Sequence, residues 1–139
     1  MSPENTFRFI LVSSIIAIIL SVSAGIGLEG SLPLELQTYL AWEAEQDIST
    51  SLGIFFLTVL ILYIINVVGL WKFKPWAKKM YVVITVFSFI SLPLLGPMVM
   101  NAWESMFYDI AILLEGALLV LLFVGPVANK FNPIIVESS

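Results

Sequence analysis

Two apolar runs joined by a short basic turn decide the fold: LGIFFLTVLILYIINVVGLW at residues 52–71, KFKP at 72–75, and WAKKMYVVITVFSFISLPLL at 76–95. Each run reaches the roughly 20 residues that a helix needs to cross a hydrocarbon core of about 30 Å. The bilayer interior offers no water to the backbone, so each run must close its own hydrogen bonds as a helix. This stretch therefore predicts a helical hairpin in a membrane.

Two further runs, Phe7–Leu28 and Met106–Val124, pass the same test of length. The chain is 60% hydrophobic and 12% charged, whereas soluble domains carry about 25% charged residues. We therefore expect an all-α fold, with residues 1–139 forming a single transmembrane domain built as a four-helix bundle. The apolar run Phe9–Ala24 exceeds the core of about 7–15 residues typical of a signal peptide, so we expect a retained helix.

The basic residues occupy alternate connections of this predicted bundle. They lie at the start of the first span, between the second and third spans or at the start of the third, and after the fourth: Arg8, Lys72, Lys74, Lys78, Lys79 and Lys130. The other two connections contain none. The positive-inside rule then places both termini and the Lys-rich turn in the cytoplasm.

The opposite face is predicted to be acidic. Its candidate residues are Glu29, Glu35, Glu43, Glu45, Asp47, Glu104 and Asp109. An acidic surface attracts basic partners, so we expect this face to be able to bind a basic polypeptide or another membrane protein.

The longer outer connection, residues 29–51, has helical spacing of apolar residues from Leu32 to Leu40. We expect an amphipathic helix over about residues 32–47 on the membrane surface, with Ser31 as its N-cap and Pro33 in its first turn. An acidic solvated loop is the alternative. In the third span, Pro93, Gly96 and Pro97 predict a kink or an early exit from the membrane.

Glu115 is the one charge-capable residue well inside a predicted span, about nine residues or ~12 Å from its outer end at ~1.5 Å per residue. A carboxylate at that depth is costly unless it is protonated or finds partners. It could be a proton or cation site, or it could hydrogen-bond to hydroxyls and fix helix packing. The side chains at similar depth, which could converge on it, are Ser21, Thr58, Tyr63, Ser88 and Ser91.

Small and amide side chains suggest where helices approach one another. Asn66 is expected to make an interhelical hydrogen bond, with a transport role as the alternative. The pairs Ser21/Gly25 and Ser23/Gly27 have the small-x-x-x-small spacing that lets helix backbones come close. They could serve packing within the chain or a homodimer.

The basic turn is also aromatic, and Pro75 is expected to end the second helix there. We expect this turn to anchor the chain to anionic lipid headgroups, each lysine contributing about 1 kcal/mol. A specific partner site is the alternative. The candidate anchor residues are Lys72, Lys74, Trp76, Lys78 and Lys79.

Three motifs, FKPWAKKMY at 73–81, PLLGP at 93–97 and LEGAL at 114–118, carry a resemblance over roughly the C-terminal half of the chain. They resemble a group of uncharacterised small bacterial inner-membrane proteins, in which an aromatic-basic-Pro-Trp-Ala-basic turn joins two spans. The resemblance implies a bacterial inner-membrane location and this topology, and it implies no activity.

The chain has no cysteine and no histidine, which excludes disulfides, thiolate chemistry and imidazole-based catalysis or metal binding. We expect a protein that is not an enzyme, with no catalytic residue, no cofactor, no metal and no nucleic-acid partner. A lipid-modifying enzyme would need a pair of reactive groups, and only the loop acids Glu104 and Asp109 offer one.

The expected function is protein interaction in the membrane, either as an accessory subunit or as an immunity-type protein against a pore-forming toxin. The second form is an analogy of size and span number alone. The alternative is a small oligomeric transporter or channel subunit that uses Glu115 as a proton or cation site.

Overall fold

The computed structural model describes residues 2–45, 50–91, 93 and 98–132. Over these residues the chain is helical and contains no strand, which confirms the all-α prediction. The elements in chain order are α1 (Pro3–Gly27), the 3-10 turn η1 (Glu29–Ser31), α2 (Leu34–Glu45), α3 (Thr50–Trp71), α4 (Pro75–Ser91), α5 (Ala102–Phe123) and α6 (Pro126–Lys130).

Three of these helices are long and apolar enough to cross a membrane: α1, the stretch Gly53–Trp71 of α3, and α5. Helix α4 is described over 17 residues, which gives about 25 Å at ~1.5 Å per residue. That length falls short of a hydrocarbon core of about 30 Å. The predicted kink at Pro93, Gly96 and Pro97 lies largely outside the described residues.

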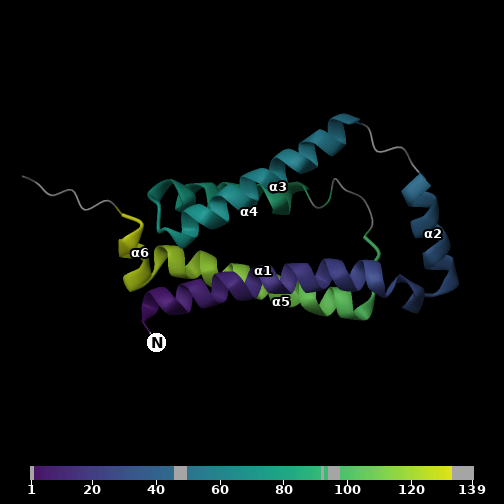
Figure 1. Ribbon diagram of the computed structural model, residues 1–139, viewed down its shortest axis with the longest axis horizontal. Helices are drawn as coiled ribbons and strands as arrows, with labels where there is room; N and C mark the ends of the chain where they lie inside the picture. Colours follow the sequence, from purple (N-terminus) through teal and green to yellow (C-terminus); the bar gives the residue numbers. More distant parts are fainter. Residues whose placement is uncertain (1, 46–49, 92, 94–97, 133–139) are drawn as a thin grey trace, which may run out of the picture.

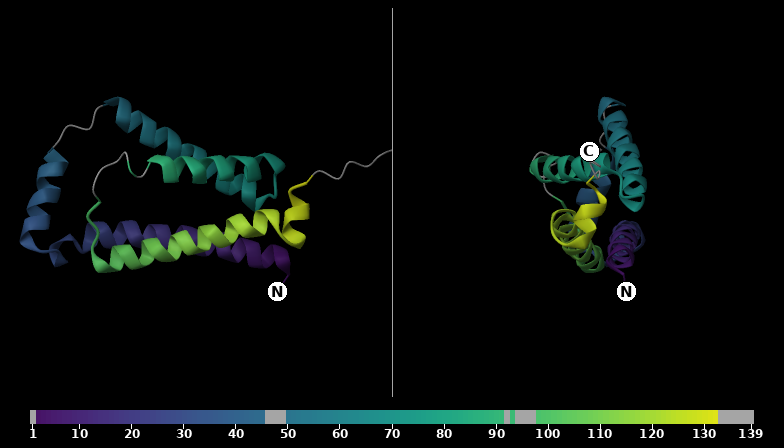
Figure 2. Two further views of the ribbon diagram at one scale, coloured as in Figure 1. Left: turned by 180° about the vertical axis from the view of Figure 1, so that it is seen from behind. Right: turned by 90° about the vertical axis from the view of Figure 1, so that its left-hand side faces the viewer.

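The helices are arranged as two antiparallel pairs, α1 with α5 and α3 with α4 (Figure 1). The N-terminus, the α3–α4 turn and α6 meet at one end of the molecule, here called the basic end. Helix α2 and the start of α5 lie at the other, here called the acidic end. The two pairs lie close together at the basic end, and α3 diverges from α1 and α5 toward the acidic end (Figure 2).

The hydrophobic core joins the two pairs at the basic end. It draws side chains from every helix except α2: Phe7, Leu11, Leu70, Ala77, Tyr81, Leu118, Leu122, Val127 and Phe131. Within it Phe7, Phe73 and Phe131 form an aromatic triplet, with ring centroids 5.3 to 5.7 Å apart. Aromatic pairs in these tilted and edge-on arrangements add to the stability gained from burial.

The turn between α3 and α4 closes tightly because of its backbone geometry. The amide of Lys74 donates to the Gly69 carbonyl at 2.9 Å, and that of Phe73 donates to the Leu70 carbonyl at 3.0 Å. This is the Schellman pattern, in which the residue after the helix takes a left-handed conformation. That residue is usually glycine, and here it is Phe73 with φ of 51°. The ring's place in the aromatic triplet offsets the strain of the positive φ.

Asn66 ties the two helices of this hairpin together, as the sequence predicts. Its side-chain amide is fully buried in α3 and donates to the Ala77 carbonyl of α4 at 2.8 Å. Among the described residues its carbonyl oxygen has no hydrogen-bond partner. Asn66 therefore has a packing function that accounts for its position in an apolar helix.

Helix α2 lies at the acidic end and has no buried residue, and its Leu40 and Ala44 line a groove together with Gly25 and Glu104. Its start differs from the sequence prediction, because Ser31 does not cap it. Ser31 belongs to η1 and donates its hydroxyl to the Leu28 carbonyl at 2.6 Å, while α2 begins after Pro33. The side-chain amide of Gln37 instead fixes the residues before the helix, because it donates a hydrogen bond to the Leu32 carbonyl at 2.6 Å.

Candidate functional site

Glu115 lies near the middle of α5, about 20 Å from the start of the helix and about 12 Å from its end at ~1.5 Å per residue. It lies farther from the start of its helix than the sequence suggested, because α5 begins at Ala102 rather than near Met106. A capping box explains the earlier start. The Glu104 amide donates to the side chain of Asn101 at 2.9 Å, and the Asn101 amide donates back to the Glu104 carboxylate at 3.3 Å.

A small cavity of about 100 Å³ lies beside Glu115, between α4 and α5. Its polar lining consists of one carboxyl group and three hydroxyl groups. The lining residues are Ile84, Thr85, Ser88, Phe89, Tyr108, Ile112 and Glu115. A cavity of this size and polarity has room for water, which needs several polar neighbours.

Hydrogen bonds to backbone carbonyls fix the orientation of most hydroxyls around Glu115. Tyr81 donates to the Glu115 carbonyl at 3.1 Å, Thr85 to the Tyr81 carbonyl at 2.9 Å, and Ser88 to the Ile84 carbonyl at 2.9 Å. The hydroxyl oxygens of Thr85 and Ser88 remain free as acceptors. Over the described part of the chain, no basic side chain pairs with the Glu115 carboxyl. The Glu115 carboxyl group therefore lies beside a small polar cavity, with hydroxyl groups as its polar neighbours there.

Of the residues predicted to converge on Glu115, the structure brings Ser88 into its cavity. Ser21 donates instead to the Glu104 carbonyl at 3.0 Å, at the acidic end. Thr58 donates to the Ile54 carbonyl within α3 and lines a separate apolar cavity against α4. Tyr63 and Ser91 are half-buried and do not line the Glu115 cavity.

Three polar residues of this site, Tyr81, Thr85 and Tyr108, were not predicted. A helical repeat could have found two of them. Tyr108 precedes Glu115 by two turns of α5, and Thr85 lies one turn before Ser88 on the same face of α4. Tyr81 belongs to the same α4 face and contacts the backbone of Glu115 rather than its carboxyl group.

The acidic end is held by a junction between α1 and α5. Asn101 is buried and donates its side-chain amide to the Ala24 carbonyl at 2.8 Å. A Cβ on Gly25 would lie 2.8 Å from the Glu104 carboxylate oxygen Oε1, so this glycine lets the two helices approach. Ser21/Gly25 therefore serves packing within the chain, whereas a Cβ on Gly27 would meet nothing within 4 Å.

The acidic residues predicted for a binding face differ in their environment. Glu104 is half-buried in the capping box, and Asp47 lies outside the described residues. The remaining ones are exposed at or near the acidic end: Glu29, Glu35, Glu43, Glu45 and Asp109.

The predicted anchor residues all lie at the basic end. Lys72, Lys74, Trp76 and Lys79 are exposed, and Lys78 is half-buried. The Lys78 ammonium lies 4.3 Å from the ring centroid of Phe123, a cation–π contact.

The two basic residues outside this turn are engaged within the chain. The guanidinium carbon of Arg8 lies 5.1 Å from the Trp71 ring centroid and 5.2 Å from that of Phe73. Lys130 and Glu4 form an ion pair at 2.9 Å, which links the end of α6 to the start of α1. Across the described ranges, no group of acidic side chains is arranged to hold a metal ion.

No protein-family model, curated protein or solved structure matches the chain. The resemblance to small bacterial inner-membrane proteins therefore stays a prediction that rests on the three motifs that carry it.

Proposed function

We propose that this chain is a bacterial inner-membrane protein that crosses the membrane four times, has both termini in the cytoplasm, and acts by binding another membrane protein. In this topology α4 crosses the membrane as the third span, in addition to α1, α3 and α5, and the acidic end faces outward. The asymmetry of the basic residues supports the orientation. The function is non-enzymatic, in keeping with a sequence that has no cysteine and no histidine.

The observation that carries this proposal is the exposure of α3 near the acidic end. Four consecutive residues, Ile54–Leu57, are all exposed, with 61% of Ile54 and 58% of Leu57 accessible. Consecutive residues point about 100° apart around a helix. Phe55 packs against Phe87 of α4, with ring centroids 5.9 Å apart, and the rest of the chain leaves the other faces of this turn largely uncovered. Membrane helices associate through close packing, and a partner helix would complete the bundle here.

The charge of the same end indicates the chemistry of the partner. Glu43 and Glu45 are exposed on α2, and no basic residue lies between Arg8 and Lys72 in the sequence. A partner with a membrane-spanning helix and basic residues at its outer end fits this surface. Such a partner could be a larger complex, with this chain as accessory subunit, or a pore-forming toxin, with this chain as immunity protein.

Photo-crosslinking in the native membrane tests the proposal. A photoreactive amino acid at Leu57 should give a protein adduct of discrete mass, whereas the same group at the exposed Val68, on the basic-end half of α3, should give none. Replacing Glu43 and Glu45 by lysine should reduce the adduct several-fold. Crosslinks to lipid alone at both positions would contradict the proposal.

The Glu115 cavity favours a second candidate function, a transporter or channel subunit with Glu115 as its proton or cation site. The supporting observation is the gathering of Thr85, Ser88 and Tyr108 around the cavity that Glu115 lines. In vesicles containing the purified chain, Glu115→Gln should slow proton or cation flux at least tenfold, while Glu43→Gln should leave it unchanged. Flux that is the same in wild type and Glu115→Gln would exclude this function.

A further inference from the structure

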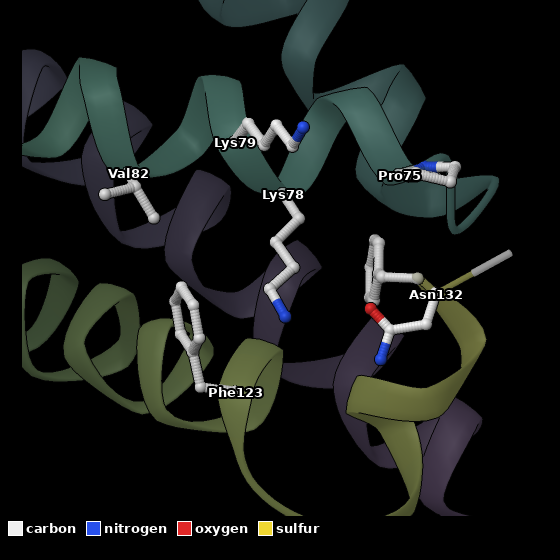
Figure 3. A pocket seen from close by; sticks show the side chains of 7 residues that line it. Pro75, Lys78, Lys79, Val82, Phe123 and Asn132 are labelled. Carbon is white, nitrogen blue, oxygen red and sulfur yellow. The ribbon is translucent and has the colours of Figure 1, made fainter.

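A cavity of about 550 Å³ lies at the basic end between the start of α4 and the end of α5. Its volume falls within the range of about 300–1,000 Å³ typical of small-molecule sites. Figure 3 shows Lys78 extending from α4 into the space between Phe123 and Asn132. The cavity is lined by Pro75, Lys78, Lys79, Val82, Phe123, Phe131 and Asn132.

The electrostatics of this cavity favour an anion. Lys78 and Lys79 follow Pro75 closely at the N-terminal end of α4, and the first turn of that helix contains no acidic residue. The N-terminus of a helix already carries a partial positive charge, so lysines placed there repel it unless an anion is bound nearby. The ring of Phe123 contacts the Lys78 ammonium without neutralising it. Over the described residues, no carboxylate forms an ion pair with either lysine.

The remaining lining residues favour a ligand with an apolar part. Val82 and Phe123 form one wall, and 55% of the Phe123 surface is exposed. A free inorganic anion would leave this wall uncovered. A phospholipid would place its phosphate at the lysines and the first carbons of an acyl chain against the wall, where the basic end of the molecule meets its apolar helices.

We propose that this cavity is a binding site for an anionic phospholipid. Lys78 and Lys79 contact the phosphate, the Asn132 amide donates a hydrogen bond to it, and Val82 and Phe123 cover the start of an acyl chain. The site differs from a general attraction of four surface lysines to the membrane, because Lys72 and Lys74 do not line it. It is independent of the partner proposed for the acidic end.

Native mass spectrometry of the detergent-purified full chain tests this site. The protein is mixed with equal amounts of phosphatidylglycerol, phosphatidylethanolamine and phosphatidylcholine, and the bound lipid is identified. The wild type should retain one phosphatidylglycerol in at least fivefold preference over the other two. The variant K78Q/K79Q should lose that preference, while K72Q/K74Q, which removes the same charge from the same turn, should keep it within twofold.

Two further measurements test whether the apolar wall contributes to binding and whether free phosphate competes with the lipid. Val82→Trp fills the apolar part of the cavity and keeps both lysines, so it should weaken lipid binding at least threefold. Inorganic phosphate at millimolar concentration should not displace the lipid. Displacement by phosphate, or an equal loss in both double-lysine variants, would overturn the proposal.

Discussion

Asn101 makes contacts at two helix ends at once. Its side-chain oxygen accepts the Glu104 amide at the start of α5, and its side-chain nitrogen donates to the Ala24 carbonyl at the end of α1. An N-cap contributes about 0.5–2 kcal/mol, and an additional buried hydrogen bond about 1 kcal/mol. One buried residue thus sets both where α5 begins and how α1 lies against it.

Asn101→Ala should therefore lower the free energy of unfolding by about 1–3 kcal/mol, because it removes the cap and the bond to α1 together. Unfolding of the purified protein in mixed micelles, followed by loss of helical circular dichroism, measures the change. Asn101→Ser is the matched control, since serine caps helices well and lacks the donor to Ala24. It should lose roughly half as much, and equal losses in the two variants would show that the cap contributes nothing.

At the scale of elements, the α3–α4 hairpin depends on close approach at Gly69. A Cβ at this position would lie 2.7 Å from the Ala77 Cβ and 2.6 Å from an atom of the Trp76 ring. Both neighbours belong to the start of α4, and Ala77 has no side-chain torsion with which to move away. A larger residue at Gly69 must therefore push the two helices apart.

Gly69→Ala should destabilise the protein by about 1–3 kcal/mol, the usual effect of overpacking. Gly116→Ala is the control in α5, since a Cβ there would meet nothing within 4 Å and alanine is the better helix former. It should leave the stability unchanged or slightly raised. The same mixed-micelle unfolding experiment compares them, and a Gly69→Ala variant as stable as wild type would contradict the close contact.

Hydropathy alone predicted an all-helical chain with apolar spans, because the length of an apolar run is a local property of the sequence. The start of α5 was also readable, since Asn101 and Glu104 have the capping-box spacing. The strained turn at Phe73 could not be predicted, because an aromatic residue rarely takes a positive φ and no sequence pattern indicates that this one does. The structure shows the reason only through the contacts of Phe73 with Phe7 and Phe131.

The sequence predicts the level of each candidate residue along its helix, but not the side of the helix on which it lies. Counting residues places Ser21, Thr58 and Ser88 at similar levels, yet only Ser88 faces Glu115. Helices in lipid have no solvent-facing side, so the apolar pattern that orients a soluble helix carries little information here. The helical spacing of Tyr108, Ile112 and Glu115 along α5, and of Thr85 and Ser88 along α4, is a signal in the sequence for which side of each helix faces the site.

At the scale of the whole molecule, the arrangement of the two ends has a consequence for topology. The N-terminus, the turn around Lys72 and the residues after α6 share the basic end, and α2 lies at the acidic end (Figure 1). If α4 spans the membrane with the other three helices, all residues at the basic end must lie on the same side of the membrane. Because the chain has no cysteine, single-cysteine variants can report each position without background.

We expect Ser2→Cys, Lys72→Cys and Asn132→Cys to be protected in intact cells from a membrane-impermeant thiol reagent and to react after the membrane is opened. Glu43→Cys and Trp103→Cys, at the acidic end, should react in intact cells. The decisive position is Trp103, because it follows α4. If α4 did not cross, Trp103→Cys would be protected together with Lys72→Cys, and α5 would carry Asn132 to the outside, where Asn132→Cys would react. That pattern would also contradict the 2.9 Å ion pair between Lys130 and Glu4, because it would place the two residues on opposite sides of the bilayer.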